Sequence, residues 1–296
     1  YDSDGVGIFK FVGALAAGTW ASGGNLNTAR VSLRGSGTQT AGLAVGGSTS
    51  TVLANTELYN GSSWTEVNDL NTARRNMGVA GTQTASIAGT GAGAPAPLSP
   101  SCELWNGTSW TEVADMNTYR QSQSACGTST SALTAGGEPG NPTNAETWNG
   151  SSWTAIATIS SGGITGMAGV SNSSALAISG VPGVRGVNVE QWNGSGWTEI
   201  ANVNVPRYHA GTSGTVTEAL FFGGGDPIVT NTEYWNGSSW TEVANLSTAT
   251  ANMMASNQSA SAALSAGGFV SGSPNGVTTT EEWTIPETLT KTFDVS

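Results

Sequence analysis

The chain has 296 residues, of which only 10% are charged, and its formal net charge is −11. It contains two lysines, Lys10 and Lys291, and no cluster of basic residues that could neutralise phosphate groups. These features argue against nucleic-acid binding and disfavour docking to an anionic membrane surface. No apolar run approaches the roughly 20 residues that a membrane-spanning helix needs. We therefore expect neither a nucleic-acid partner nor membrane insertion.

A flank outside the repeated region opens the chain, and a second one closes it. Residues 1–14 contain the strand-like run Gly7–Val12, and the first residue is tyrosine, which indicates a processed chain or a piece of a longer polypeptide. Residues 286–296 contain the strand-like run Leu289–Val295. The two runs would pair with each other or with a neighbouring subunit, so a homo-oligomer is one alternative.

Residues 15–285 consist of six copies of one repeat. A hairpin of the type Trp-Asn-Gly-Ser-Ser-Trp occurs in five copies, and a sixth is split between Trp283 and Trp20 at the two ends. The second tryptophan recurs every 43–46 residues. Periods of about 40–50 residues are typical of propellers and solenoids. The recurring tryptophans are Trp20, Trp64, Trp110, Trp153, Trp197 and Trp240.

Each copy predicts four short strands. One example of each, taken in repeat order, is Asn76–Ala80, Ala41–Val45, Glu57–Tyr59 and Trp64–Val67. The Asn-Gly between the third and fourth strands predicts a type I′ turn, in which both central residues have positive φ. Glycine and alanine in the first two strands predict a crowded centre, and the tryptophans fit the wider gaps between blades.

The two ends of the repeated region are complementary fragments. Trp20 is followed by Leu26 and Arg30 at the spacing of the later copies, so it marks a fourth strand without the preceding three. The last copy ends at Trp283 without its own hairpin. An open solenoid would instead need polar caps at both ends. We predict an all-β, six-bladed β-propeller of four-stranded blades, closed by an N-terminal strand that completes the last blade.

This pattern resembles the kelch-repeat β-propellers. A glycine pair ends the second strand, a Glu-x-aromatic strand follows, and a tryptophan comes about six residues later. Two copies depart from the pattern, with Gly89-Thr90-Gly91 and Ser179-Gly180 in place of the pair. The matching pairs are Gly46-Gly47, Gly136-Gly137, Gly223-Gly224 and Gly267-Gly268. Kelch-type rings are often adaptors or carbohydrate-active proteins, so the resemblance implies a fold more firmly than a function.

The near-identical units are also similar to the WNGSSWTEVA-type repeat arrays encoded by marine phages and environmental microbes. Such arrays often occur in virion fibre or surface proteins. The resemblance implies a virion or extracellular location. It further implies other virion proteins, cell-surface proteins or a host-surface glycan as partners.

One glutamate recurs at the same strand position of every copy. Repetition predicts similar surroundings for all six, whereas two catalytic carboxylates need contrasting ones. We expect a scaffold role, in which each carboxylate accepts hydrogen bonds from loop N–H groups or from Arg30, Arg74, Arg120 and Arg207. The six glutamates are Glu57, Glu103, Glu146, Glu190, Glu233 and Glu281.

Residues suited to metal binding or catalysis are few. The two cysteines, Cys102 and Cys126, lack metal-ligand spacing and are expected as buried, idle thiols, with their pairing left open. The single histidine, His209, cannot form a two-histidine metal site. We expect no catalytic residue, no metal and no cofactor.

The copies differ most in the loops between the second and third strands. These loops are residues 48–55, 92–101, 138–144, 181–188, 225–231 and 269–279. On a propeller they share one face with the loops between blades, and variable loops on a rigid scaffold are typical of recognition surfaces. The candidate ligand-binding residues on this face are Tyr119, Arg185, Tyr208, His209 and Asp226.

We therefore predict a non-enzymatic recognition or structural module of a virion, such as a phage tail or capsid surface, or of another extracellular surface. It would bind a glycan or a protein through its variable loops. The alternatives are a carbohydrate-active enzyme on the same ring and an assembly subunit held through its terminal strands.

Overall fold

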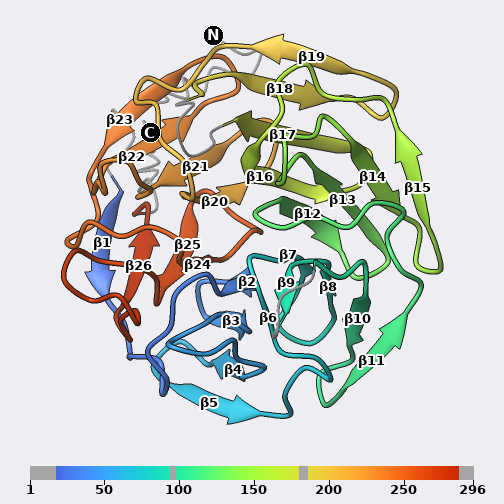
Figure 1. Cartoon of the computed structure of the whole chain (residues 1–296). Coiled ribbons are helices and arrows are strands. Elements are labelled where there is room, and N and C mark those ends of the chain that lie inside the picture. The colour runs from blue at the N-terminus through green and yellow to red at the C-terminus, as the bar shows by residue number, and fades with distance from the viewer. Residues whose placement is uncertain (1–17, 94–97, 180–185, 287–296) are drawn as a thin grey trace, which may run out of the picture.

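A computed structural model describes residues 18–93, 98–179 and 186–286. Within these ranges the protein is all-β, and no helix occurs. Six antiparallel sheets of four strands each surround a common axis, as Figure 1 shows. The prediction of a six-bladed β-propeller is therefore confirmed. The flank 1–14 and residues 287–296 of the other flank lie outside the described residues.

The first three blades follow one another along the chain. Blade one contains β2 (Arg34–Thr38), β3 (Ala41–Val45), β4 (Thr56–Tyr59) and β5 (Trp64–Val67). Blade two contains β7 (Gly78–Gly81), β8 (Ser86–Gly89), β10 (Cys102–Trp105) and β11 (Trp110–Val113), with the small ribbon β6 (Arg74–Arg75) and β9 (Ala92–Gly93) at one end. Blade three contains β12 (Ser124–Thr128), β13 (Ser131–Ala135), β14 (Ala145–Trp148) and β15 (Trp153–Ile156).

The remaining blades complete the ring. Blade four contains β16 (Ile164–Ser171), β17 (Ser174–Ser179), β18 (Val189–Trp192) and β19 (Trp197–Ile200). Blade five contains β20 (Gly211–Gly214), β21 (Ala219–Phe222), β22 (Thr232–Trp235) and β23 (Trp240–Val243). Blade six contains β24 (Met254–Ala255), β25 (Ala262–Ala266), β26 (Thr280–Thr284) and, from the other end of the chain, β1 (Thr19–Ser22).

Strand β1 is the outermost strand of blade six. It runs antiparallel to β26 with Trp20 opposite Trp283, and the two indole rings lie 5.5 Å apart between centroids. In the other blades the outermost strand follows its neighbour directly through a hairpin. Blade six therefore combines a strand from the start of the described chain with three from its end.

The hairpin between the third and fourth strands differs from the predicted type I′ turn. Four residues, Asn60 to Ser63, separate the paired Tyr59 and Trp64. Gly61 has a φ of 90°, whereas Asn60 is absent from the residues with positive φ, so the I′ prediction was wrong. Instead the Asn60 side-chain oxygen accepts hydrogen bonds from the N–H groups of Ser62 and Ser63, at 3.0 and 2.9 Å. The asparagine thus acts through its side chain, as in an Asx turn.

The hydrophobic core lies between the blades. In each of six clusters among the described residues, side chains from two consecutive blades pack together. For example, Leu43 and Val45 of blade one belong to one cluster with Met77, Trp105 and Trp110 of blade two. Burying an indole ring of about 150–250 Å² stabilises the fold by about 4–6 kcal/mol at most. The interfaces between blades therefore supply most of the apolar stabilisation.

Several of the repeated tryptophans also form a polar contact with the neighbouring blade. Trp64 Nε1 donates to Thr280 Oγ1 of blade six at 3.0 Å, and Trp110 Nε1 donates to Thr56 Oγ1 of blade one at 3.1 Å. Trp20 Nε1 makes the same kind of contact to Thr232 Oγ1 of blade five at 3.1 Å. These indoles therefore fix the position of one blade on the next as well as filling the gap.

Buried glutamates attach the loops between blades to the sheets. The Glu57 carboxylate accepts from the N–H and the side-chain amide of Asn27, at 2.7 and 2.9 Å, and from Arg30 Nη2 at 3.0 Å. Equivalent Arg–Glu ion pairs join Arg74 to Glu103, Arg120 to Glu146 and Arg207 to Glu233. Glu190 and Glu281 bind loop N–H groups, and no arginine among the described residues pairs with them. The structure thus places all six glutamates within the scaffold.

Candidate functional site

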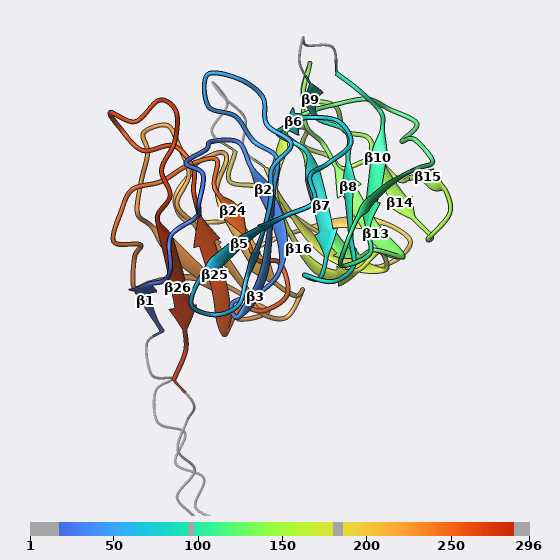
Figure 2. The same ribbon diagram turned by 90° about the horizontal axis from the view of Figure 1, so that it is seen from below.

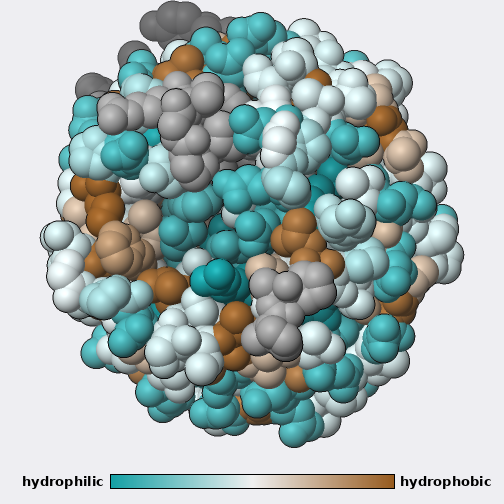
Figure 3. Space-filling view, in the orientation of Figure 1, coloured by the Kyte–Doolittle hydropathy of each residue, from teal (hydrophilic) through white to brown (hydrophobic). Residues whose placement is uncertain are grey.

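One end of the ring carries the loops between the second and third strands and the loops that connect the blades. At this end, short bridges extend the first two strands of a blade beyond the glycine pair, as between Tyr208 and Gly225 and between Ala251 and Phe269. Figure 2 shows β6 and β9 of blade two at the same end. We call this end of the ring the loop face. Figure 3 shows that hydrophilic residues gather around its centre.

A pocket of about 410 Å³ opens between blades five and six on the loop face. Its volume falls within the range of about 300–1,000 Å³ that is usual for small-molecule sites. It combines aromatic and aliphatic side chains with a carboxylate, an imidazole and an amide. The lining residues are Tyr208, His209, Gly225, Asp226, Pro227, Ile228, Ala251, Asn252 and Phe269.

Backbone hydrogen bonds hold both walls of this loop-face pocket. Tyr208 and Gly225 exchange N–H···O bonds of 2.9 and 2.8 Å, and Ala251 and Phe269 exchange bonds of 3.0 and 2.7 Å. Because hydrogen-bonded backbone segments form both walls, the pocket has a defined shape without a ligand. Such preorganisation reduces the entropy that binding costs.

His209 lies where the pocket meets the centre of the ring. Its φ is 55°, and its ring packs edge-to-face on Tyr208 at 4.9 Å. Burial, assisted by the positive charge of Arg34, lowers the pKa of His209 to about 3. The imidazole is therefore neutral at neutral pH, with one donor and one acceptor nitrogen. Neither nitrogen has a hydrogen-bond partner within the described part of the chain.

Backbone hydrogen bonds link five of the six blades around the axis at the level of His209. The residue twelve positions after the repeated tryptophan has a left-handed φ in five of the copies, from 54° to 58°. Four hydrogen bonds each run from one such N–H to the carbonyl of the preceding blade: Asn76 to Ser32, Ser122 to Asn76, Ser32 to Asn252 and Asn252 to His209, at 2.8–2.9 Å. The blades are thus linked around the axis as well as through their tryptophans.

The structure brings together three of the five residues predicted to bind a ligand. Tyr208, His209 and Asp226 line one pocket, because the loop between blades and the loop after the second strand meet there. Tyr119 is 60% exposed and lies outside that pocket. Arg185 lies outside the described residues.

Six lining residues were not predicted from the sequence, among them Gly225 and Ala251. Pro227, Ile228 and Phe269 belong to loops recognised as variable, and their apolar character next to Asp226 was the available signal. Asn252 occupies the same repeat position as His209, so counting from the tryptophan could have found it. The asparagine that binds the scaffold glutamate, as Asn27 binds Glu57, was also missed, although it recurs seven residues after the tryptophan.

The thiols and the acids show no arrangement for metal binding in the described ranges. Cys102 and Cys126 are free and buried, and burial raises the pKa of Cys102 to about 11 and that of Cys126 to about 12. No group of three or more His, Cys, Asp or Glu side chains among the described residues is placed to hold a metal ion. None of the described segments forms a helix that is long and apolar enough to cross a membrane.

Comparison with known proteins identifies the fold. No protein-family model matches the chain, and no curated protein matches it. Among solved structures, the chain is similar to YjhT, with a TM-score of 0.71 and 13% sequence identity, over 86% of this chain and 95% of that one. At this identity the likeness concerns the arrangement of the blades and not the chemistry of the site.

Proposed function

We propose that the chain is a non-enzymatic recognition module that binds a glycan in the loop-face pocket. The propeller fold is compatible with a binding role. The pocket between blades five and six is the observation that supports glycan binding. Tyr208 and Phe269 supply aromatic surface for the apolar face of a sugar ring. Asp226 and Asn252 supply hydrogen-bonding groups for its hydroxyls.

The setting that fits such a module is a virion or another extracellular surface. The support is the similarity of the repeats to kelch-type units and to the WNGSSWTEVA arrays of marine phages and environmental microbes. In that setting the partners would be neighbouring virion or cell-surface proteins and a host-surface glycan. The net charge of −11 is in keeping with a soluble, displayed protein.

A glycan array tests the proposal directly, using the full chain and incubating every bound oligosaccharide with the protein before mass analysis. We expect binding of a restricted set of glycans and recovery of each one intact. Hydrolysis of a bound oligosaccharide would favour the carbohydrate-active enzyme instead. An array without any bound glycan would remove the proposed ligand class.

Two matched alanine variants locate the site. Phe269→Ala removes a half-buried ring from the pocket, and we expect it to weaken glycan binding at least about tenfold. Tyr119→Ala removes an exposed ring elsewhere on the protein and should leave the affinity unchanged. Equal losses in the two variants would place the contact surface outside the pocket.

A further inference from the structure

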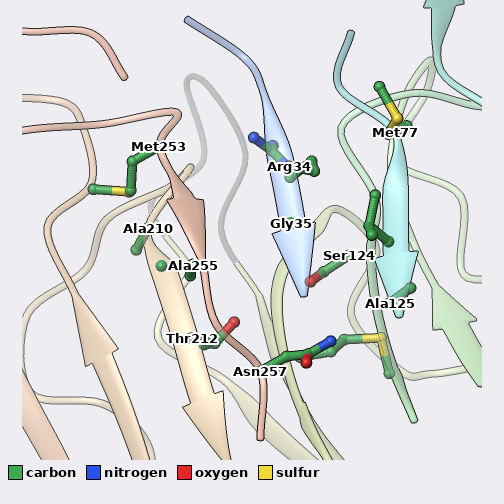
Figure 4. Close-up of a pocket in the computed structure, with 13 residues that line it drawn as sticks. Arg34, Gly35, Met77, Ser124, Ala125, Ala210, Thr212, Met253, Ala255 and Asn257 are labelled. Carbon is green, nitrogen blue, oxygen red and sulfur yellow. The ribbon is translucent and has the colours of Figure 1, made fainter. Parts of the chain in front are cut away.

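A narrow channel runs along the propeller axis and is distinct from the loop-face pocket. Its volume is about 40 Å³, and its walls come from the innermost strands or the adjoining residues of all six blades. Figure 4 shows Arg34 toward one end of these walls, and Thr212 and Asn257 toward the other. Because a water needs roughly 10–15 Å³ of such space, the channel admits about three waters or an ion of similar size.

Arg34 is the one cationic side chain in the channel wall. The four buried arginines of the scaffold each form an ion pair with a glutamate, at 3.0 Å in the case of Arg30 and Glu57. Among the described residues, Arg34 instead donates only to the carbonyl of its neighbour Leu33, at 3.0 Å. No carboxylate in the described part of the chain lies within ion-pair distance of it, and none lines the channel.

Arg34 is half-buried in the channel wall. Withdrawing a cation from water, even in part, is unfavourable unless a partner compensates it. Burial lowers the pKa of Arg34 to about 10, and no acidic residue opposes that effect. The group still carries its charge at neutral pH, and no acidic side chain among the described residues forms an ion pair with it.

An unsatisfied polar group accompanies this cation in the channel wall. The buried Asn257 Nδ2 lacks a hydrogen-bond partner among the described residues. An amide nitrogen offers two N–H donors. The region therefore offers a positive charge and hydrogen-bond donors, with no acid to neutralise them.

We propose that the axial channel binds a small monovalent anion beside the guanidinium of Arg34. The volume admits an ion of the size of bromide, nitrate or acetate and excludes a sugar acid. The site is independent of the glycan pocket, because its walls are the inner strands and not the variable loops. Either site can exist without the other.

Thermal unfolding of the full chain in sodium bromide tests this proposal, with sodium gluconate keeping the ionic strength constant. Gluconate is too large for the channel. We expect the midpoint of wild-type unfolding to rise on the order of 3 °C for each tenfold increase in bromide above its dissociation constant. Crystals soaked in bromide should show anomalous scattering at the Arg34 guanidinium.

Two arginine variants make the test specific. Arg34→Met should abolish the response to bromide, and in gluconate it should be at least as stable as the wild type, because it removes a half-buried charge that no described acidic residue pairs with. Arg75→Met alters an exposed arginine and should respond like the wild type. The proposal is overturned if Arg34→Met retains the bromide response, or if gluconate stabilises the wild type as strongly as bromide does.

Discussion

Arg30 Nη2 donates to Glu57 Oε1 at 3.0 Å, and both side chains are completely buried. Blades four and six show which half of this pair the repeat needs. Their glutamates, Glu190 and Glu281, keep the bonds to loop N–H groups, although Gly163 and Thr250 replace the arginine. The carboxylate therefore holds the loop in every blade, and the arginine is an addition in four of them.

The first prediction follows from this difference. Arg30→Met should reduce the free energy of unfolding by about 3–5 kcal/mol, because it leaves the Glu57 carboxylate buried without its counter-charge. Adding Glu57→Gln should recover a large part of that loss, since the neutral amide oxygen can still accept from the Asn27 N–H. Urea denaturation of the two single variants and the double variant measures the coupling. Additive losses would mean that the pair does not act as a unit.

The second prediction concerns a tyrosine that joins blade one to blade six. Tyr59 Oη donates to Glu282 Oε1 at 2.5 Å and accepts from the N–H of Gly24 at 3.2 Å. Burial, followed by the bond to Glu282, raises the pKa of Tyr59 to about 12. Tyr59→Phe should destabilise the protein by about 1–2 kcal/mol, because a backbone N–H loses its acceptor.

A second tyrosine provides the control for this measurement. Tyr234 Oη donates to Glu218 Oε2 at 3.0 Å near the surface, where water can replace the lost bond. Tyr234→Phe should change the free energy of unfolding by less than about 0.5 kcal/mol. Equal losses in the two variants would contradict the larger stabilisation that we expect from the contact between blades one and six.

The third prediction compares two glycines with positive φ. At Gly46, with φ of 59°, an added Cβ would lie 2.3 Å from the carbonyl oxygen of Arg74 and 2.4 Å from Met77 Cε. At Gly61, with φ of 90°, the nearest atom would be Thr40 Cβ at 3.5 Å. Gly61→Ala should cost about 1–2 kcal/mol for its backbone conformation, whereas Gly46→Ala should cost at least about 3 kcal/mol. Chemical denaturation ranks them, and a reversed order would contradict the steric explanation.

The architecture could be predicted because periodicity survives sequence variation. The tryptophan spacing and the incomplete copies at the two ends defined six blades before any contact was known. The hairpin turn was predicted wrongly, since Asn-Gly is shared by type I′ turns and by the four-residue loop found at Asn60. Only the φ of the asparagine and the bonds to its side chain distinguish them.

The candidate sites were less predictable, because they depend on contacts between blades. Asp226 and Phe269 belong to different repeats, and no local sequence pattern indicates that their loops line the same pocket. Within the described residues, the lack of an acidic partner for Arg34 is a property of all six inner strands together. Sequence comparison of the repeats showed where variation lies, whereas the three-dimensional ring determines which variable residues meet.

The fourth prediction uses the pH dependence of stability at His209. Because the folded state lowers the pKa from its ordinary value of 6.5 to about 3, the unfolded state binds more protons between these two values. The contribution of His209 is therefore fully present above pH 6.5 and is lost as the pH falls toward 3. Within this window the free energy of unfolding should decrease by up to about 1.4 kcal/mol per pH unit.

The variant His209→Asn isolates this contribution from that of the carboxylates. Asparagine occupies the equivalent left-handed position at Asn76 and Asn252, with φ of 54° and 55°, so the backbone should accept it at His209. Denaturation curves of both proteins from pH 4 to pH 8 give the difference in stability. We expect this difference to change with pH between 4 and 6 and to be constant above pH 7. A constant difference over the whole range would show that the imidazole has an ordinary pKa in the folded protein.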